Sequence, residues 1–158
     1  MSTFTKYVRV IIEQAEREAR SDHSTTIEAQ HVLLAIAARP EAAPGQVLSS
    51  AGLDRETLRD ALNLEHEHSL SAAGISVAAA HLPRSDTRAP APTSLGASVR
   101  QALERGVAGV REQPRPAHLL LGILLAQVGT VPRALALAGI DRDALLVRVQ
   151  QMLAEARP

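Results

Sequence analysis

The sequence predicts an all-α protein in which two four-helix repeats, related by a pseudo-twofold axis, pack as a single domain. Three observations support this fold class. Apolar residues make up 46% of the 158 residues, yet Phe4 and Tyr7 are the only aromatic ones, so the core must be built from aliphatic side chains. Small side chains, above all Ala, favour closely packed helices. Apolar residues recur at helical spacing, and a set of residues recurs at a constant offset of 87 positions.

The first repeat begins with two predicted helices. From Thr5 to Arg20, apolar residues share one helical face and charged residues share the other. Thr25 and Glu28 then stand in the spacing of a capping box, which indicates that a second helix starts near Glu28 and ends near Ala38. This second helix is apolar on nearly every side, so we expect it to be central.

Two further helices complete the repeat. A short one is expected from Gln46 to Ala51, ended by Gly52 in a left-handed conformation. Asp54 is placed to cap the last helix, which we expect to end near Leu64. Residues 65–92 are rich in Ser, Pro, Ala and Gly without sustained periodicity and are interpreted as a linker. The predicted organisation is therefore repeat one at 3–64, linker at 65–92 and repeat two at 93–155.

The second repeat restarts the same pattern after the linker. The expected helices are Ser94–Val110, His118–Gln127, Val131–Ala138 and Asp141–Glu155. Each matches a helix of the first repeat, and the pairs include His31 with His118, Gly52 with Gly139, and Asp54 with Asp141. A constant offset over four successive elements indicates a duplicated structural unit. Two such units can bury their most apolar helices against each other and leave a groove where they meet.

Charge and composition limit the classes of function. The 17 basic and 17 acidic residues cancel, so the bulk field that draws proteins to nucleic acids or anionic membranes is missing. There is no cysteine, no signal-peptide pattern at the start, and no apolar run near the roughly 20 residues that span a bilayer. We expect a soluble cytoplasmic protein that binds neither nucleic acid nor membrane.

Histidines supply the main candidates for chemistry. His66 and His68 could share a metal, with His23 or His81 as a third ligand, which would make the chain a metal-dependent enzyme. Two residues apart on a helix point to different faces, however, so a solvated helix end is the favoured interpretation. His31 and His118 begin apolar helices at equivalent positions, and we expect each imidazole to anchor a helix terminus by hydrogen bonds.

Other functional motifs are missing from the sequence. It contains no nucleophile elbow, zincin helix, deaminase signature, dinucleotide-binding glycines or phosphate-binding GxxxxGK[ST] loop, so we expect no enzyme and no cofactor. A small helical DNA-binding protein is a further alternative, because Arg142, Arg148 and Arg157 lie along the last helix. Acidic residues alternate with these arginines, which favours an ordinary solvated face.

The segments FTKYVRVIIEQAEREAR, AQHVLLAIA and AGLDRETL, with their second-half counterparts, resemble the duplicated N-terminal domain of Clp-type AAA+ unfoldases, especially the ClpC branch. The resemblance covers about residues 3–155. It implies a free-standing, non-catalytic module, without ATP hydrolysis or proteolysis, that binds Clp substrates, adaptors or peptide ligands. It also implies that the chain could modulate a full-length Clp ATPase or act as a decoy for it.

The resemblance also implies ligand-binding positions. In ClpC-like members a glutamate just before each histidine helps bind phosphorylated arginine, and Gln30 and Ala117 occupy these positions here. A carboxylate can accept two charge-assisted hydrogen bonds from a guanidinium, and losing such a contact costs about 1.5–3 kcal/mol. The resemblance therefore does not imply phosphoarginine binding in the family's usual manner.

The Phe-Thr pair of the family is present once, as Phe4 and Thr5, because Ala91 and Pro92 occupy the matching positions of the second repeat. By resemblance, Phe4 and Thr5 are candidate ligand contacts. Two interpretations of Phe4 remain open from the sequence. Its ring either anchors a hydrophobic peptide or closes the end of the first helical module.

Overall fold

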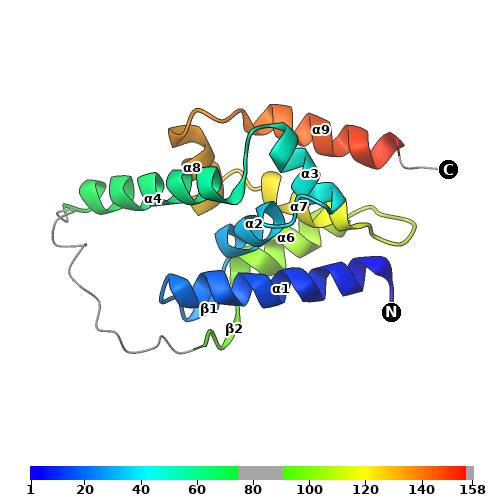
Figure 1. Ribbon diagram of the computed structural model, residues 1–158, viewed down its shortest axis with the longest axis horizontal. Coiled ribbons are helices and arrows are strands. Elements are labelled where there is room, and N and C mark those ends of the chain that lie inside the picture. Colours follow the sequence, from blue (N-terminus) through cyan, green and yellow to red (C-terminus); the bar gives the residue numbers. More distant parts are fainter. Residues whose placement is uncertain (75–90, 156–158) are drawn as a thin grey trace.

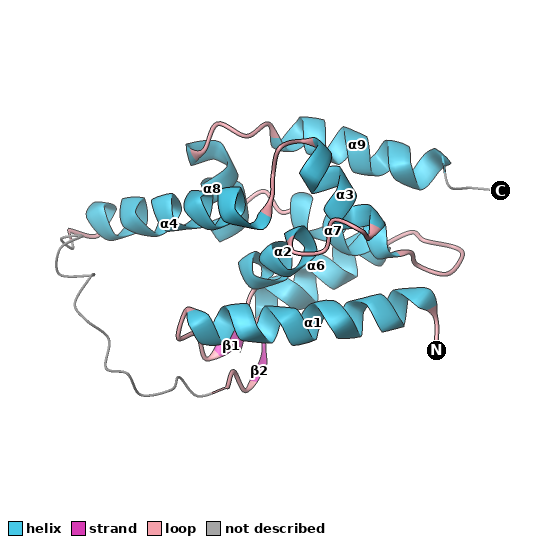
Figure 2. Ribbon diagram, in the orientation of Figure 1, coloured by secondary structure: helices cyan, strands magenta, loops and turns pink. Residues whose placement is uncertain are grey.

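The computed structural model describes residues 1–74 and 91–155, which form eight α-helices and two short strands (Figures 1 and 2). The first half contains α1 (Thr3–Ser21), β1 (Thr26–Ile27), α2 (Ala29–Ala37), α3 (Ala43–Ser50) and α4 (Arg55–Ala72). The second half contains β2 (Ser94–Leu95), α6 (Ala97–Val107), α7 (Pro116–Leu124), α8 (Thr130–Leu137) and α9 (Arg142–Glu155). The predicted all-α fold is confirmed.

The duplicated unit is visible in the helix bounds. Both ends of α7 lie 87 positions after those of α2, the same holds for α8 and α3, and α9 begins 87 positions after α4. Six or more residues of both α2 and α7 are buried, and each of these helices packs against several others, including each other. These two most apolar helices therefore form the centre of one shared core, as their composition predicts.

In the second repeat α6 and α7 cross in close contact, at the place where α1 and α2 cross in the first repeat. A Cβ on Gly122 would lie 1.8 Å from the carbonyl oxygen of Ala102, and one on Gly106 would lie 2.1 Å from that of His118. The backbones of α6 and α7 therefore lie too close together for any residue larger than glycine at these two positions. In the first repeat, Ala19 and Ala35 occupy the matching positions and are fully buried.

A parallel pairing of β1 with β2 joins the two repeats and corrects the predicted start of the second. The sequence suggested a helix from Ser94, but Ser94 and Leu95 pair with Thr26 and Ile27, and α6 begins only at Ala97. Gly96 permits this arrangement, because a Cβ there would collide with the carboxylate of Glu28. The pairing had no sequence signal, since two-residue strands have no periodicity.

The helix α4 continues to Ala72 and not to Leu64 as expected, so the segment interpreted as the start of the linker is helical. The buried positions Leu58, Ala61, Leu62 and Glu65 keep helical spacing, but the last of them is charged. Glu65 is buried because its carboxylate accepts hydrogen bonds from Ser69 at 2.6 Å and from Arg133 of α8 at 3.1 Å. Apolar periodicity alone therefore ends the helix too early.

Candidate ligand-binding groove

A groove of about 300 Å³ lies between the two repeats. The start of α2 forms one wall, α6 forms another, and the α7–α8 connection with the start of α8 completes it. The lining residues are Glu28, Ala29, Gln30, Ser98, Gln101, Arg105, Ile123, Ala126, Gln127, Val128, Gly129, Thr130, Val131, Pro132 and Arg133. Gln30 is thus the one residue of the four predicted ligand contacts that lines this groove.

Two arginines line the groove, and each is held by its Nε atom. Arg105 Nε donates to the carbonyl oxygen of Gly122 at 3.2 Å, and Arg133 Nε donates to Glu65 at 3.1 Å. Within residues 1–74 and 91–155, the Nη atoms of both side chains have no hydrogen-bond or ion-pair partner. The Arg133 side chain is 57% exposed. The groove therefore presents guanidinium donors that the described part of the chain leaves without an acceptor.

The acidic residue of the lining, Glu28, is engaged on both oxygens. One oxygen accepts from the hydroxyl of Thr26 at 2.7 Å, and the other accepts from the hydroxyl of Ser98. Ser98 also accepts a hydrogen bond from the backbone N–H of Ala29 at 2.8 Å. These contacts tie the start of α2 in the first repeat to α6 in the second and fix the spacing of the two walls.

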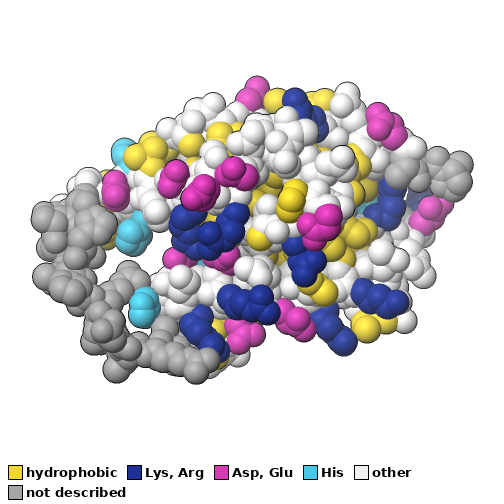
Figure 3. Space-filling view, viewed as in Figure 1, with side chains coloured by type: hydrophobic (Ala, Val, Ile, Leu, Met, Phe, Trp, Pro, Cys, Tyr) yellow, Lys and Arg dark blue, Asp and Glu magenta, His cyan; other side chains and the backbone are white. Residues whose placement is uncertain are grey.

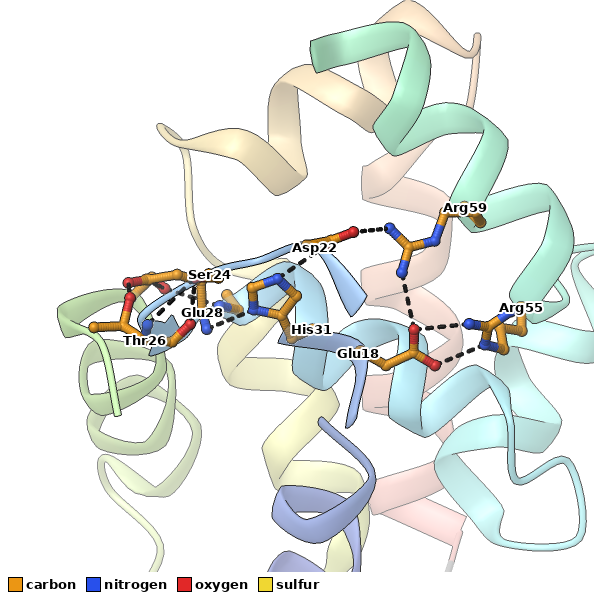
Figure 4. Close-up of polar contacts among 10 residues, drawn as sticks. Glu18, Asp22, Ser24, Thr26, Glu28, His31, Arg55 and Arg59 are labelled. Carbon is orange, nitrogen blue, oxygen red and sulfur yellow. Dashed lines mark hydrogen bonds and ion pairs between the residues drawn. The ribbon is translucent and has the colours of Figure 1, made fainter. Parts of the chain in front are cut away.

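His31 anchors the start of α2 (Figure 4). Its Nδ1 accepts a hydrogen bond from the backbone N–H of Glu28 at 2.9 Å, so in the neutral ring Nε2 carries the proton and donates to Asp22 at 3.1 Å. The predicted cap is thereby corrected. Glu28, and not Thr25, is the N-cap residue, and the imidazole three residues later takes the part that a Glu or Gln side chain plays in a capping box.

The His31 contact belongs to a network of charged groups on α1 and α4. Glu18, 2% exposed, pairs with Arg55 and Arg59, and Arg59 also pairs with Asp22 (Figure 4). Burial alone would raise the pKa of Glu18, but hydrogen bonds and charge from the two arginines outweigh it and lower the pKa. The pKa of Asp22 is likewise lowered against burial, by the hydrogen bond from His31 and the charge of Arg59. The network joins α1 to α4, and both of its acids, Glu18 and Asp22, are paired with arginine.

His118 repeats the backbone contact of His31 in the second repeat. Its Nδ1 accepts from the backbone N–H of Arg115 at 2.8 Å. Burial lowers its pKa, which favours the neutral imidazole that can accept this bond. Both histidines therefore sit where a helix-anchoring role requires them, and neither lines the groove.

The turn residues that the repeat pattern singled out occupy matching conformations. Gly52 and Gly139 have φ values of 78° and 72°, in the left-handed region that follows a helix end. Asp54 accepts a hydrogen bond from the backbone N–H of Thr57 at 2.8 Å, and Asp141 accepts one from Ala144 at 3.1 Å. Each aspartate caps the last helix of its repeat.

Phe4, Thr5 and Ala117 are not brought to the groove. Phe4 and Thr5 lie in the first turn of α1, whose opposite end lies beside β1 (Figure 1). Phe4 is partly buried and packs against the core, and the Thr5 hydroxyl is 2.9 Å from that of Ser2. Ala117 is only 4% exposed, so it offers a ligand little surface.

The metal-dependent enzyme and the DNA-binding protein, the two alternative functions, rest on histidines and on arginines of the last helix, respectively. In residues 1–74 and 91–155, no group of three His, Asp or Glu side chains is arranged to hold a metal, and His81 lies outside these ranges. Arg142 donates to the carbonyl oxygens of Leu124 and Ala126, and Arg148 donates to Ser50. Arg157 lies outside the described residues. On the face in Figure 3, basic and acidic side chains are interspersed.

The sequence of the chain matches a known family of domains. The model of the Clp repeat (R) N-terminal domain matches residues 3–111, from α1 through α6. The chain belongs to this family. No curated protein shows significant similarity to the sequence. No helix of the described residues has the length and apolar character needed to cross a membrane.

Sequence reasoning missed most of the groove. Arg105, Gln127 and Arg133 belong to no motif, and Gln101 stood out only as the counterpart of Gln14 in the repeat. One signal was available in the repeat itself. Arg105 lies 87 positions after Glu18, so the two copies carry opposite charges at one equivalent position. Such a difference between duplicated units marks a residue whose role is not shared by both copies.

Proposed function

We propose that this chain is a non-catalytic binding module that holds segments of other polypeptides in the groove between its two repeats. The groove is the observation that supports the proposal. Its volume of about 300 Å³ suits a few side chains of an extended segment, not a folded domain. Its lining combines amide groups, which can both donate and accept hydrogen bonds, with the strongly exposed apolar side chain of Val128.

The family supports the same proposal, because the chain belongs to the Clp N-terminal domains. In this proposal residues 1–158 act as one domain in the cytoplasm, with Gln30 as a direct ligand contact. The chain competes with the N-terminal domain of a Clp ATPase for substrates, adaptors or peptide ligands, and it performs no chemistry itself. Phe4 and Thr5 remain predicted contacts outside the groove.

The test uses a permanently unfolded protein, reduced and carboxymethylated lactalbumin, carrying a fluorescent label. Its binding to the full chain is measured by fluorescence anisotropy. Gln127→Trp places a bulky side chain at an exposed position of the groove, and Gln150→Trp makes the same change at an exposed position of α9 outside it. We expect the first variant to lose binding and the second to keep it. Equal binding by both variants, or no binding by the wild-type chain, would overturn the proposal.

A further inference from the structure

The groove is lined by guanidinium nitrogens that have no hydrogen-bond acceptor among the described residues. Arg105 and Arg133 use Nε to hold their own positions, and their Nη atoms have no partner within residues 1–74 and 91–155. A guanidinium held at one nitrogen is already oriented, so little side-chain freedom is lost when its outer edge binds a ligand. Both side chains are thus prepared to contact a group that accepts two hydrogen bonds.

The carboxylates of Glu28 and Glu65 already accept hydrogen bonds within the fold. Both oxygens of Glu28 accept from hydroxyl groups, and the buried carboxylate of Glu65 accepts from Ser69 and from Arg133 itself. A basic ligand side chain would find no free carboxylate among the lining residues. An acidic side chain would find two guanidinium edges and three glutamine amides.

The position of Gln30 reinforces this asymmetry. Its side chain has no negative charge and carries an amide N–H₂ group that can donate. Together with Gln101 and Gln127 it adds neutral amide groups around the two arginines, and these can donate to a carboxylate as well as accept from a peptide N–H. Among the described residues, the unpartnered charged groups of the lining are therefore the guanidinium Nη atoms, which favours an anionic partner over a cationic one.

We propose that the groove selects acidic peptide segments, with an aspartate or glutamate carboxylate bound between the guanidinium groups of Arg105 and Arg133. This inference rests on the proposed function, because it names the class of polypeptide that the module holds. The carboxylate accepts hydrogen bonds from Nη atoms while the neighbouring glutamine amides bond the peptide backbone. Val128, 85% exposed, packs against an adjacent aliphatic side chain of the segment.

The experiment compares three short fluorescein-labelled peptides of equal length. They share the same aliphatic residues and differ only in the polar residues at fixed positions. One carries Asp and Glu, one carries Asn and Gln at those positions, and one carries Lys and Arg. Affinity for the full chain is measured by anisotropy at low and at high salt. We expect the acidic peptide to bind about tenfold more tightly than its amide counterpart, because charge-assisted hydrogen bonds are lost in the latter. High salt should reduce this difference, since the groove is open to solvent.

Variants then assign the preference to the groove. Arg105→Gln should weaken the acidic peptide about tenfold and bring its affinity close to that of the amide peptide. Arg100→Gln makes the same charge change on the same helix, at an exposed residue outside the groove, and should leave the preference intact. Arg133→Gln is a second, independent test of the other guanidinium. Circular dichroism at the assay temperature checks that each variant is folded.

The outcomes separate this inference from the proposed function. If the amide or basic peptide binds as tightly as the acidic one, or if Arg105→Gln and Arg100→Gln behave alike, the acidic preference is overturned. Should unfolded lactalbumin still bind and be blocked by Gln127→Trp, the proposed function survives that result. If neither the peptides nor lactalbumin bind the wild-type chain, both proposals fail together.

Discussion

Glu18 and Arg55 form an ion pair with two parallel contacts, Nε to Oε1 and Nη2 to Oε2, both at 2.7 Å. Glu18 lies on α1 and is buried, whereas Arg55 begins α4, so the pair fastens the first helix of the repeat to the last. Arg59, one helical turn further along α4, reaches the same carboxylate at 2.8 Å and also reaches Asp22 at 2.9 Å.

Replacing Arg59 with Met should destabilise the fold by about 1–3 kcal/mol, because a buried carboxylate loses one of its charged donors while the aliphatic packing is largely kept. Urea unfolding followed by circular dichroism measures the change. Arg9→Met, at an exposed position of α1, is the matched control and should alter stability by less than about 0.5 kcal/mol. Equal effects of the two substitutions would show that the network does not stabilise the fold.

The same carboxylates predict loss of stability in acid. Glu18 and Asp22 both have lowered pKa values in the folded protein, so the unfolded chain binds more protons as the pH falls. Their contribution is complete above the unfolded values near 4 and is lost as the pH drops through the folded ones. Unfolding free energies measured from about pH 6 to about pH 3 should fall, with a shallower slope in Glu18→Gln. An unchanged slope in that variant would contradict the assignment.

His118 predicts a separate pH dependence at higher pH. Burial lowers its folded pKa, so its contribution is present above the unfolded value of about 6.5 and is lost as the pH falls through the folded value. Thermal unfolding between about pH 8 and about pH 5 should show this loss, and His118→Gln should reduce it. His66→Gln, at an exposed position of α4, should leave the pH profile unchanged. If His66→Gln reduces the pH dependence and His118→Gln does not, the assignment to His118 is wrong.

Gly122→Ala should destabilise the second repeat by about 1–3 kcal/mol, because the added methyl group meets the backbone of α6 and the helices must separate. Chemical denaturation gives the magnitude. Glu104→Ala, an exposed substitution on α6, should change stability by less than about 0.5 kcal/mol. A neutral Gly122→Ala would mean that α6 and α7 can move apart without loss of packing.

Most of the fold followed from two physical regularities. Apolar residues at helical spacing located each helix, and the constant separation of His31 from His118 and of Asp54 from Asp141 showed that the helices form two equivalent sets. These signals are strong because burial and capping constrain residue type at every copy. Two misplaced ends, at Leu64 and Ser94, occur where a charged residue is buried or where an extended segment pairs with a distant one. Three others were also wrong: α3 begins at Ala43 and not Gln46, α6 ends at Val107 and not Val110, and α7 ends at Leu124 and not Gln127.

The groove was much less predictable than the helices around it. Its lining comes from three separate segments, and the polar residues among them are ordinary for an exposed helix or loop. Whether an arginine is free or engaged depends on distant carbonyl and carboxylate groups, such as Gly122 for Arg105 and Glu65 for Arg133. Those contacts form only when the helices pack together, so no local sequence pattern predicts them.

The parallel contact between β1 and β2 has a thermodynamic consequence. Gly96 donates to the carbonyl oxygen of Ile27 at 2.8 Å, immediately beside the residues that open α2 and α6. A ligand that contacts both repeats in the groove would stabilise the same contact between them and would dissociate when the protein unfolds. The melting temperature must then rise with ligand occupancy, so an increase in melting temperature can detect a specific ligand before its identity is known.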